Sequence, residues 1–283
     1  MFDFNKFQPI ELDDLIRLGG KYDGGYILAK RQIEKTKTIL SFGVQLDWAF
    51  EKAFFKRKNV KIYAYDLSTK ELLEKSAWYW IRFSLRSCAG VVYNLARLNP
   101  YRAKEHLWQI CLKSKFYRFF NSKKERHFIP KYLGTRDDDT HTSLGTVFKE
   151  LGNVDDTSIF LKMDIEGAEY DTLPQLVKHL DKINGIAIEV HFLATRGGEF
   201  IKLLDMLLEK FYIAHVHGNN YCGLVENTEI PNIIEVTLIN KNLITGSVAP
   251  SREKYPIKGL DSPCNRYKQD YVLPFTQTGS CGA

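Results

Sequence analysis

The 283-residue chain lacks the long apolar runs that membrane proteins require. No apolar stretch reaches the roughly 18 residues of a transmembrane helix. The first residues also lack the basic region followed by an apolar region that marks a secretory signal. We therefore expect neither a membrane span nor a signal peptide, and a location in the cytoplasm.

Cysteine is scarce and scattered, with five residues at Cys88, Cys111, Cys222, Cys264 and Cys281. They form no CxxC pair and show no zinc-binding spacing. An odd number of widely separated cysteines is typical of a reducing compartment and does not suggest a disulfide framework.

Acidic residues are few in one segment of the chain. Residues 70–126 contain 13 Lys or Arg against 4 Asp or Glu, a local balance of +9 where the whole chain carries +6. The segment is rich in aromatic residues and largely helical in pattern, so it indicates a helical insertion at about 68–126. Its basic face would suit nucleic acid, a phosphate-bearing substrate, an anionic membrane surface or a second copy of the chain. It is equally consistent with a cap whose charges are solvated.

The clearest pattern lies in residues 158–169, where a short apolar run ends in Asp164, Glu166 and Gly167. Such a run, bounded by a turn and followed by a helical pattern, predicts a buried parallel strand. Ligands of open α/β sheets lie outside the carboxyl ends of the strands. Two carboxylates at that edge are costly as packing elements, so they are candidates for ligand binding or proton transfer.

Strands and helices alternate on both sides of this run. We expect strands at 38–43, 60–66, 127–134, 158–163, 186–192, 212–220 and 233–239, and helices at 48–58, 144–151, 170–180 and 200–211. Leu12, Leu15, Ile16 and Leu18 have helical spacing, and Gly24-Gly25 indicates a hairpin. The pattern predicts one Rossmann-like α/β domain over 1–283, with about seven strands, helices on both faces and an N-terminal helix and hairpin within 1–37.

The first half of this pattern is that of a mononucleotide-binding unit. The strand at 38–43 ends at Gly43, Asp47 can cap the next helix, and the following strand ends at Asp66. The glycine would allow close approach of a ligand, and the acid would bind ribose hydroxyls. GxGxxG is missing, which disfavours a dinucleotide.

Polar groups stand at five strand ends: Gly43 with Asp47, Asp66, Asp164 with Glu166, Glu189 with His191, and residues 217–220. A single polar strand end is more often structural than catalytic. Five at one edge would meet in a shared crevice.

Residues 161–169, LKMDIEGAE, resemble the K-x-D-I-E-G-x-E signature of the FkbM-type methyltransferases. DGGY at 23–26, LSFG at 40–43, EVHF at 189–192 and HGNN at 217–220 are similar to flanking parts of that family, in its order, over residues 17–240. The resemblance implies a class I methyltransferase sheet and S-adenosylmethionine as methyl donor.

The resemblance also implies roles for individual residues. Donor-binding residues would be Asp23, Tyr26, Ser41, Phe42, Gly43, Asp47, Asp66, Leu67 and Asp164, with residues 137–142 beside the adenine. Catalytic residues would be Asp164, Glu189, His191 and His217, and substrate-binding residues would be Glu166, Asn219 and Asn220.

A hydroxyl acceptor needs a base or a metal to remove its proton. His217 or His191 is a candidate base, because imidazole titrates near neutral pH. Alternatively, Asp164, Glu189 and a histidine would hold a divalent ion, and these oxygen-rich ligands suit magnesium or manganese more than zinc. We favour the metal-free version.

The resemblance favours a sugar hydroxyl as acceptor, and the basic insertion favours a nucleotide-activated sugar or glycan precursor of surface polysaccharide synthesis. An RNA methyltransferase or nucleic-acid-binding protein is the alternative, although neither an RNP-type motif nor an NPPY-like tetrapeptide occurs. A donor-binding scaffold without catalysis is a third hypothesis. The insertion is also a candidate surface for joining two copies of the chain.

Overall fold

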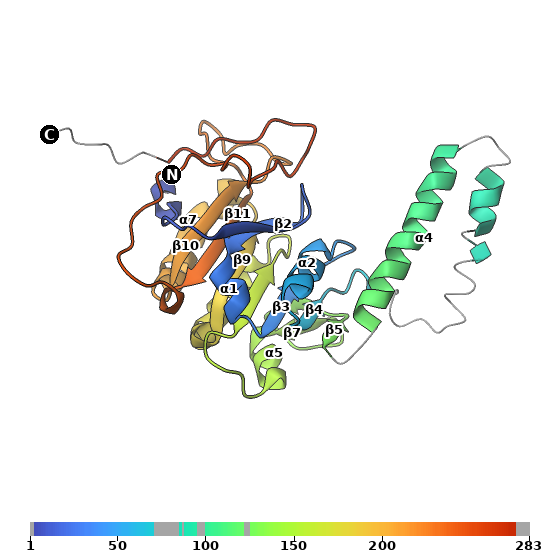
Figure 1. Ribbon diagram of the computed structural model, residues 1–283, viewed down its shortest axis with the longest axis horizontal. Helices are drawn as coiled ribbons and strands as arrows, with labels where there is room; N and C mark the ends of the chain where they lie inside the picture. Colours follow the sequence, from blue (N-terminus) through green and yellow to red (C-terminus); the bar gives the residue numbers. More distant parts are fainter. Residues whose placement is uncertain (1–2, 71–84, 87, 95–99, 122–124, 276–283) are drawn as a thin grey trace.

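The computed structural model describes residues 3–70, 85–86, 88–94, 100–121 and 125–275. Its centre is a seven-stranded sheet (Figure 1), in which β11 is antiparallel to both of its neighbours and the other pairs are parallel. In spatial order the strands are β10 (Phe211–Gly218), β11 (Ile234–Asn240), β9 (Ile183–Val190), β8 (Ile159–Met163), β3 (Thr38–Phe42), β4 (Lys61–Tyr65) and β5 (Arg126–Ile129). The predicted Rossmann-like α/β fold is confirmed.

The strand order reverses between β3 and β8. From β3 the chain builds outward through β4 to β5, and it then returns to β8 on the other side of β3. This reversal is the topological switch point at which open α/β sheets bind their ligands, beyond the carboxyl ends of the strands.

Both faces of the sheet are covered, which explains the nearly continuous apolar strands. Ile159 and Leu161 of β8 pack into one core, and Phe160 between them packs into the other. The first core takes side chains from α5 (Leu144–Leu151), α6 (Glu169–Leu176) and α7 (Leu193–Leu208). The second takes them from α1 (Lys30–Lys35), α2 (Ala49–Arg57) and the hairpin of β1 (Leu15–Gly19) and β2 (Gly25–Ala29).

The N-terminal part corrects one prediction. Residues 15–19, expected to be helical, form β1, which pairs with β2 from Leu15↔Ala29 to Gly19↔Gly25. The predicted hairpin is therefore confirmed and the helix is wrong. Four apolar residues with helical spacing also fit a short strand, and pairing with the fully buried β2 decides between the two.

Other boundaries differ in smaller ways. The predicted strand at 127–134 divides at Pro130 into the edge strand β5 and β6 (Tyr132–Gly134), which pairs with β7 (His141–Ser143). Helix α7 begins seven residues before its predicted start, and α6 gives way to a 3₁₀ turn, η3 (Val177–Lys182). Ser143 caps α5 as predicted, accepting a hydrogen bond from Thr146 N at 3.2 Å. Two further 3₁₀ turns are η1 (Phe4–Phe7) and η4 (Lys241–Leu243).

The predicted helical insertion contains α4 (Pro100–Asn121), which projects away from the sheet in Figure 1. Residues 71–84, 87, 95–99 and 122–124 of the predicted insertion lie outside the described residues. The last turns of α4 are anchored to the second core, where Phe116 contacts Trp48 edge-on at 5.2 Å between ring centroids. Among the described residues, no helix has the length and apolarity to cross a membrane.

Replacing Phe116 with alanine is expected to destabilise the protein by about 3–5 kcal/mol, because a fully buried ring leaves a cavity. Chemical denaturation measures the change. The control Trp108→Ala, on the same helix but 59% exposed, should change stability by less than about 0.5 kcal/mol. Equal effects of the two substitutions would contradict the anchoring role of Phe116.

Candidate active site

Gly43 and Asp164 bring the ends of β3 and β8 together at the switch point. Gly43 has a φ of +75°, and a Cβ atom there would lie 1.6 Å from the carbonyl oxygen of Asp164. No other residue type fits this close approach. The loop after β3 therefore lies directly on the turn that carries Asp164.

Lys162 contacts both the loop after β3 and the turn that carries Asp164. Its ammonium is buried, donates to Gly43 O at 3.0 Å and lies 3.5 Å from Asp164 Oδ2. Burial lowers the pKa of Lys162, but Asp164, Glu51 and Glu189 outweigh it and leave the pKa above its ordinary value. The lysine is thus a permanent positive charge beneath the predicted donor site.

Asp66, at the end of β4, orders the adjoining loops. Its Oδ2 accepts from Gln45 N at 2.7 Å, and its Oδ1 accepts from the backbone N and hydroxyl of Ser68 at 2.7 and 2.5 Å. The carboxylate is buried, while Leu67 beside it is partly exposed. Two carboxylate oxygens offer about four acceptor sites, so room for a ribose hydroxyl remains.

The side chains of Ser41 and Phe42 lie inside the protein, contrary to their predicted contact with the donor. Ser41 is buried and its hydroxyl donates to Glu51. Phe42 is buried and stacks on Tyr65 with 4.9 Å between ring centroids. Both belong to a strand covered on its two faces, so neither side chain reaches the crevice.

The hairpin brings Asp23 and Tyr26 to this edge, next to Asp47 in the loop before α2. A Cβ atom on Gly24 would lie 2.6 Å from Asp47 Oδ2, so the turn packs against the start of α2. Asp47 accepts from Ala49 N at 2.9 Å, consistent with its predicted place at the start of that helix. Burial and the nearby carboxylates, with Asp164 the largest of these, raise the pKa of Tyr26 well above its ordinary value.

Three carboxylates converge beside the hairpin. The ligand atoms of Asp23, Glu189 and Glu235 all lie within 4.8 Å of one another. Burial raises the pKa of Glu189 well above its usual range, and Asp164, Glu235 and Asp23 add to the effect. Asn219 holds Glu189, donating to its Oε1 at 3.0 Å, and so supports the predicted catalytic residue.

His191 is held by the buried Glu169. Its Nδ1 lies 3.0 Å from Glu169 Oε1, and its Nε2 lies 3.4 Å from Glu189 and 3.5 Å from Glu166. Burial lowers the pKa of His191, but the hydrogen bond with Glu169 and the charges of Glu169, Asp164 and Glu166 outweigh it, so the pKa is raised. One ring nitrogen is thus fixed by Glu169, and the other lies near the carboxylates of Glu189 and Glu166.

His217 has no ring nitrogen left for a substrate. Its Nδ1 lies 3.1 Å from Glu235 Oε2, and its Nε2 lies 3.1 Å from both oxygens of Asp270. Burial lowers the pKa of His217, but the bonds to Asp270, Cys264 and Glu235 raise it far above its ordinary value. This arrangement removes His217 from the candidate bases and leaves His191.

Asn220, predicted to bind substrate, is instead a structural residue. It is fully buried, donates to the carbonyl groups of Asn265, Lys268 and Gln269, and accepts from Asn265 N at 2.6 Å. Its amide is therefore used up in holding residues 265–269 on the end of β10.

The sheet edge also brings together three side chains that fit the predicted alternative, a divalent metal ion. The ligand atoms of Asp164, Glu166 and His191 lie within 4.8 Å of one another. Glu166 has a φ of +56°, and the turn it forms with Gly167 points its carboxylate toward His191. These three side chains could hold a divalent ion of the magnesium or manganese type.

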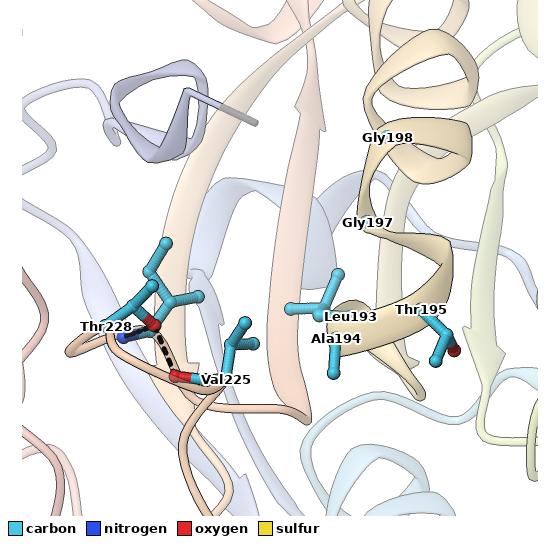
Figure 2. Close-up of a pocket in the computed structure, with 8 residues that line it drawn as sticks. Leu193, Ala194, Thr195, Gly197, Gly198, Val225 and Thr228 are labelled. Carbon is cyan, nitrogen blue, oxygen red and sulfur yellow. Dashed lines mark hydrogen bonds between the residues drawn. The ribbon is translucent and has the colours of Figure 1, made fainter. Parts of the chain in front are cut away.

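A separate pocket of about 400 Å³ opens beside the start of α7. Figure 2 shows Leu193, Ala194 and Thr195 of this helix on one side, and Val225 with Thr228 on the other. Its lining contains none of the predicted site residues. The pocket is therefore separate from the candidate site at the acidic edge, which we define by Asp23, Asp164, Glu189 and Glu235.

Four residues of the site were given no catalytic or binding role on sequence grounds: Lys162, Glu169, Glu235 and Asp270. Lys162 and Glu169 stand within the motif at 161–169, and Lys162 is the one charged residue in the apolar run of β8, a signal that was available. Glu235 is the one charged residue of β11, a signal that was available. Asp270 follows no strand or helix, so no periodicity pointed to it.

The sheet topology, the glycine loop at the switch point and the acid at the end of the second parallel strand define a Rossmann-like nucleotide-cofactor fold. The family model "Methyltransferase FkbM domain" matches residues 55–219, more than half of the chain. The protein therefore belongs to the FkbM methyltransferase family and is a methyltransferase that depends on S-adenosylmethionine.

Comparison with solved structures gives more distant likenesses. The precorrin-6y C5,15-methyltransferase of Geobacter metallireducens is 10% identical, with 74% of this chain and 86% of that chain covered and a TM-score of 0.32. A fibrillarin/Nop5p complex is 11% identical, with 82% and 98% covered and a TM-score of 0.35. TrmK of M. capricolum, in complex with S-adenosyl-homocysteine, is 12% identical, with 76% and 69% covered and a TM-score of 0.32. No curated protein matches the sequence.

Replacing Lys162 with methionine should weaken donor binding at least tenfold and destabilise the fold by about 3–5 kcal/mol, because it leaves Asp164 and Glu51 without their buried counter-charge. Calorimetry with S-adenosylmethionine and chemical denaturation measure the two effects. Lys61→Met, at an exposed position on β4 of the same sheet, is the control. Unchanged donor affinity in the Lys162 variant would contradict the link between this lysine and the donor loop.

Proposed function

We propose that the protein transfers a methyl group from S-adenosylmethionine to a hydroxyl of a sugar. The acceptor is a nucleotide-activated sugar or another glycan precursor of surface polysaccharide synthesis. The observation that carries the proposal is the buried pair of His191 and Glu169. The Nε2 atom of His191 lies near Glu189 and Glu166, at the same sheet edge as Gly43 and Asp164.

The residues at the switch point fit a sulfonium donor. Gly43 allows close approach of the methionine part, Asp66 takes a ribose hydroxyl, and residues 137–142 border the adenine. Asp23 and Tyr26 close over the amino-acid end. A positively charged sulfur placed among Asp23, Asp164 and Glu189 would favour their charged forms, against the burial that raises the pKa values of Asp23 and Glu189.

The bound donor supplies an electrophilic methyl group, and the chain positions the acceptor and removes its proton. In this proposal His191 Nε2 takes the proton of the acceptor hydroxyl. Glu169 keeps the other proton on Nδ1 and stabilises the imidazolium that results. Asp164 and Glu189 orient the hydroxyl, and Asn219 fixes Glu189.

The basic insertion supports a phosphorylated acceptor. Lys104, Lys115 and Arg118 are exposed along α4, whose last turns are anchored beside the donor half of the sheet. A row of cations on a projecting helix attracts polyanionic ligands and raises their association rate. The proposal places the enzyme in the cytoplasm, and the free Cys88, Cys111, Cys222 and Cys264 agree with a reducing compartment.

Mass spectrometry of candidate acceptors incubated with the enzyme and S-adenosylmethionine tests the function. We expect one added methyl group on a nucleotide sugar and none on RNA. Asp164→Asn should lower kcat at least about 100-fold, as loss of a positioned charge does. The control Asp171→Asn, at an exposed ion pair with Arg196, should keep full activity. Methylation of RNA alone, or a fully active Asp164 variant, would contradict the proposal.

The pH dependence of kcat/KM tests the role of His191. Because only the neutral imidazole accepts a proton and the pKa of His191 is raised, activity should increase with pH through a value above the ordinary pKa of histidine. Glu169→Gln removes the strongest cause of the raised pKa and should shift this rise to lower pH. The exposed control Glu199→Gln should leave it in place. If Glu169→Gln leaves the pH profile unchanged, or if a chelator abolishes activity, the proton is removed by a group other than His191.

A further inference from the structure

A second group of potential metal ligands lies below the acidic edge, where the C-terminal segment meets the sheet. It consists of His217 on β10, Glu235 on β11 and Cys264, which are 1%, 5% and 2% exposed. Their ligand atoms lie within 4.8 Å of one another. No role in methyl transfer has been assigned to Cys264, and the sequence spacing of the cysteines gave no sign of a metal site.

We propose that His217 Nδ1, Glu235 and Cys264 Sγ bind a zinc ion. One imidazole, one carboxylate and one thiolate form a mixed ligand set that suits zinc and excludes magnesium or calcium, which take oxygen ligands. The site is distinct from Asp164, Glu166 and His191, and it does not depend on the identity of the methyl acceptor.

The spacing of the three ligand atoms fits a tetrahedral centre. Zinc bonds of about 2.0–2.1 Å to N or O and about 2.3 Å to S imply about 3.3 Å between N and O and about 3.6 Å between S and either. The structure has 3.1 Å from His217 Nδ1 to Glu235 Oε2, 3.6 Å from Cys264 Sγ to Glu235 Oε1 and 3.9 Å from Cys264 Sγ to His217 Nδ1. Small adjustments of these side chains would centre an ion.

Asp270 provides the support that zinc-bound histidines have. Both of its carboxylate oxygens lie 3.1 Å from His217 Nε2, the ring nitrogen that points away from Cys264. A carboxylate at one ring nitrogen fixes the ring and directs the other nitrogen to the metal. Binding would release the Sγ proton of Cys264 and the Nδ1 proton of His217, leaving a thiolate and a neutral imidazole.

The surrounding charge favours a cation at this place. Glu235 also belongs to the group with Asp23 and Glu189, so the fourth ligand position would face two further carboxylates. A divalent ion would offset their mutual repulsion. It would also attach residues 264–270 to the end of the sheet. Asn220 already holds this segment there by hydrogen bonds.

Metal analysis of the full chain tests the proposal without any methyl acceptor. After expression with zinc and extensive dialysis, we expect about one zinc ion per chain. Cys264→Ser should lose it, whereas the control Cys222→Ser, at another free cysteine, should retain it. Asp270→Asn should weaken zinc binding about 10- to 100-fold.

Cobalt replacement identifies the ligand. Cobalt added to the chelator-treated protein should give a thiolate-to-cobalt absorption band in the wild type and in Cys222→Ser, and none in Cys264→Ser. If Cys264→Ser does not fold, titration of the chelator-treated wild type with zinc still decides, because binding should raise its Tm. A folded wild type with neither zinc nor a thiolate band would overturn the proposal, as would metal binding that is lost in Asp164→Asn and kept in Cys264→Ser.

Discussion

The site depends on one buried ammonium group. Lys162 lies under the switch point, where its proton donors reach the Gly43 carbonyl and its charge faces Asp164. A charge in this setting persists only with counter-charges close by, and Asp164, Glu51 and Glu189 provide them. The position of the loop after β3 and the position of the Asp164 carboxylate are therefore set by the same interaction, and the missing side chain at Gly43 makes the contact possible.

The remaining charges of the crevice follow from this arrangement. The acids at the ends of β8, β9 and β11 outnumber the cations among them, so burial and mutual repulsion push the pKa of Glu189 upward. The protein offsets this excess with two histidines, each bound to a buried carboxylate. Glu169 binds His191, which keeps one free nitrogen, whereas Glu235 and Asp270 together occupy both nitrogens of His217. Two histidines that look alike in the sequence thus differ because both nitrogens of His217 lie 3.1 Å from a carboxylate oxygen, whereas His191 has such a close partner only at Nδ1 and its Nε2 lies 3.4 and 3.5 Å from two others.

The sequence was sufficient to predict the sheet and part of the candidate site. The apolar run of β8 ending in Asp164, and the glycine and acid after β3 and β4, predicted a switch-point site because parallel strands end at one edge. The directions of Ser41 and Phe42 were missed because a strand buried on both faces shows no alternation. Asn220, Cys264 and Asp270 meet through an irregular C-terminal segment, which no periodicity places. Residues 15–19 form a strand because they pair with β2. The local spacing of apolar residues carries no information about that partner.

Under the proposed function, the acidic edge also distinguishes the donor from its product. S-adenosylmethionine carries a positive sulfur, and the demethylated product is neutral at that atom. Carboxylates at Asp23, Asp164 and Glu189 attract the charged form and lose that attraction once the methyl group has moved. Lys162 stays charged throughout, and once His191 has passed the acceptor's proton to solvent, the balance of the crevice has changed by about one unit charge. In a buried site at an effective dielectric near 20, one unit charge at about 4 Å is worth roughly 4 kcal/mol, so this difference is large enough to favour release of the product and binding of a new donor.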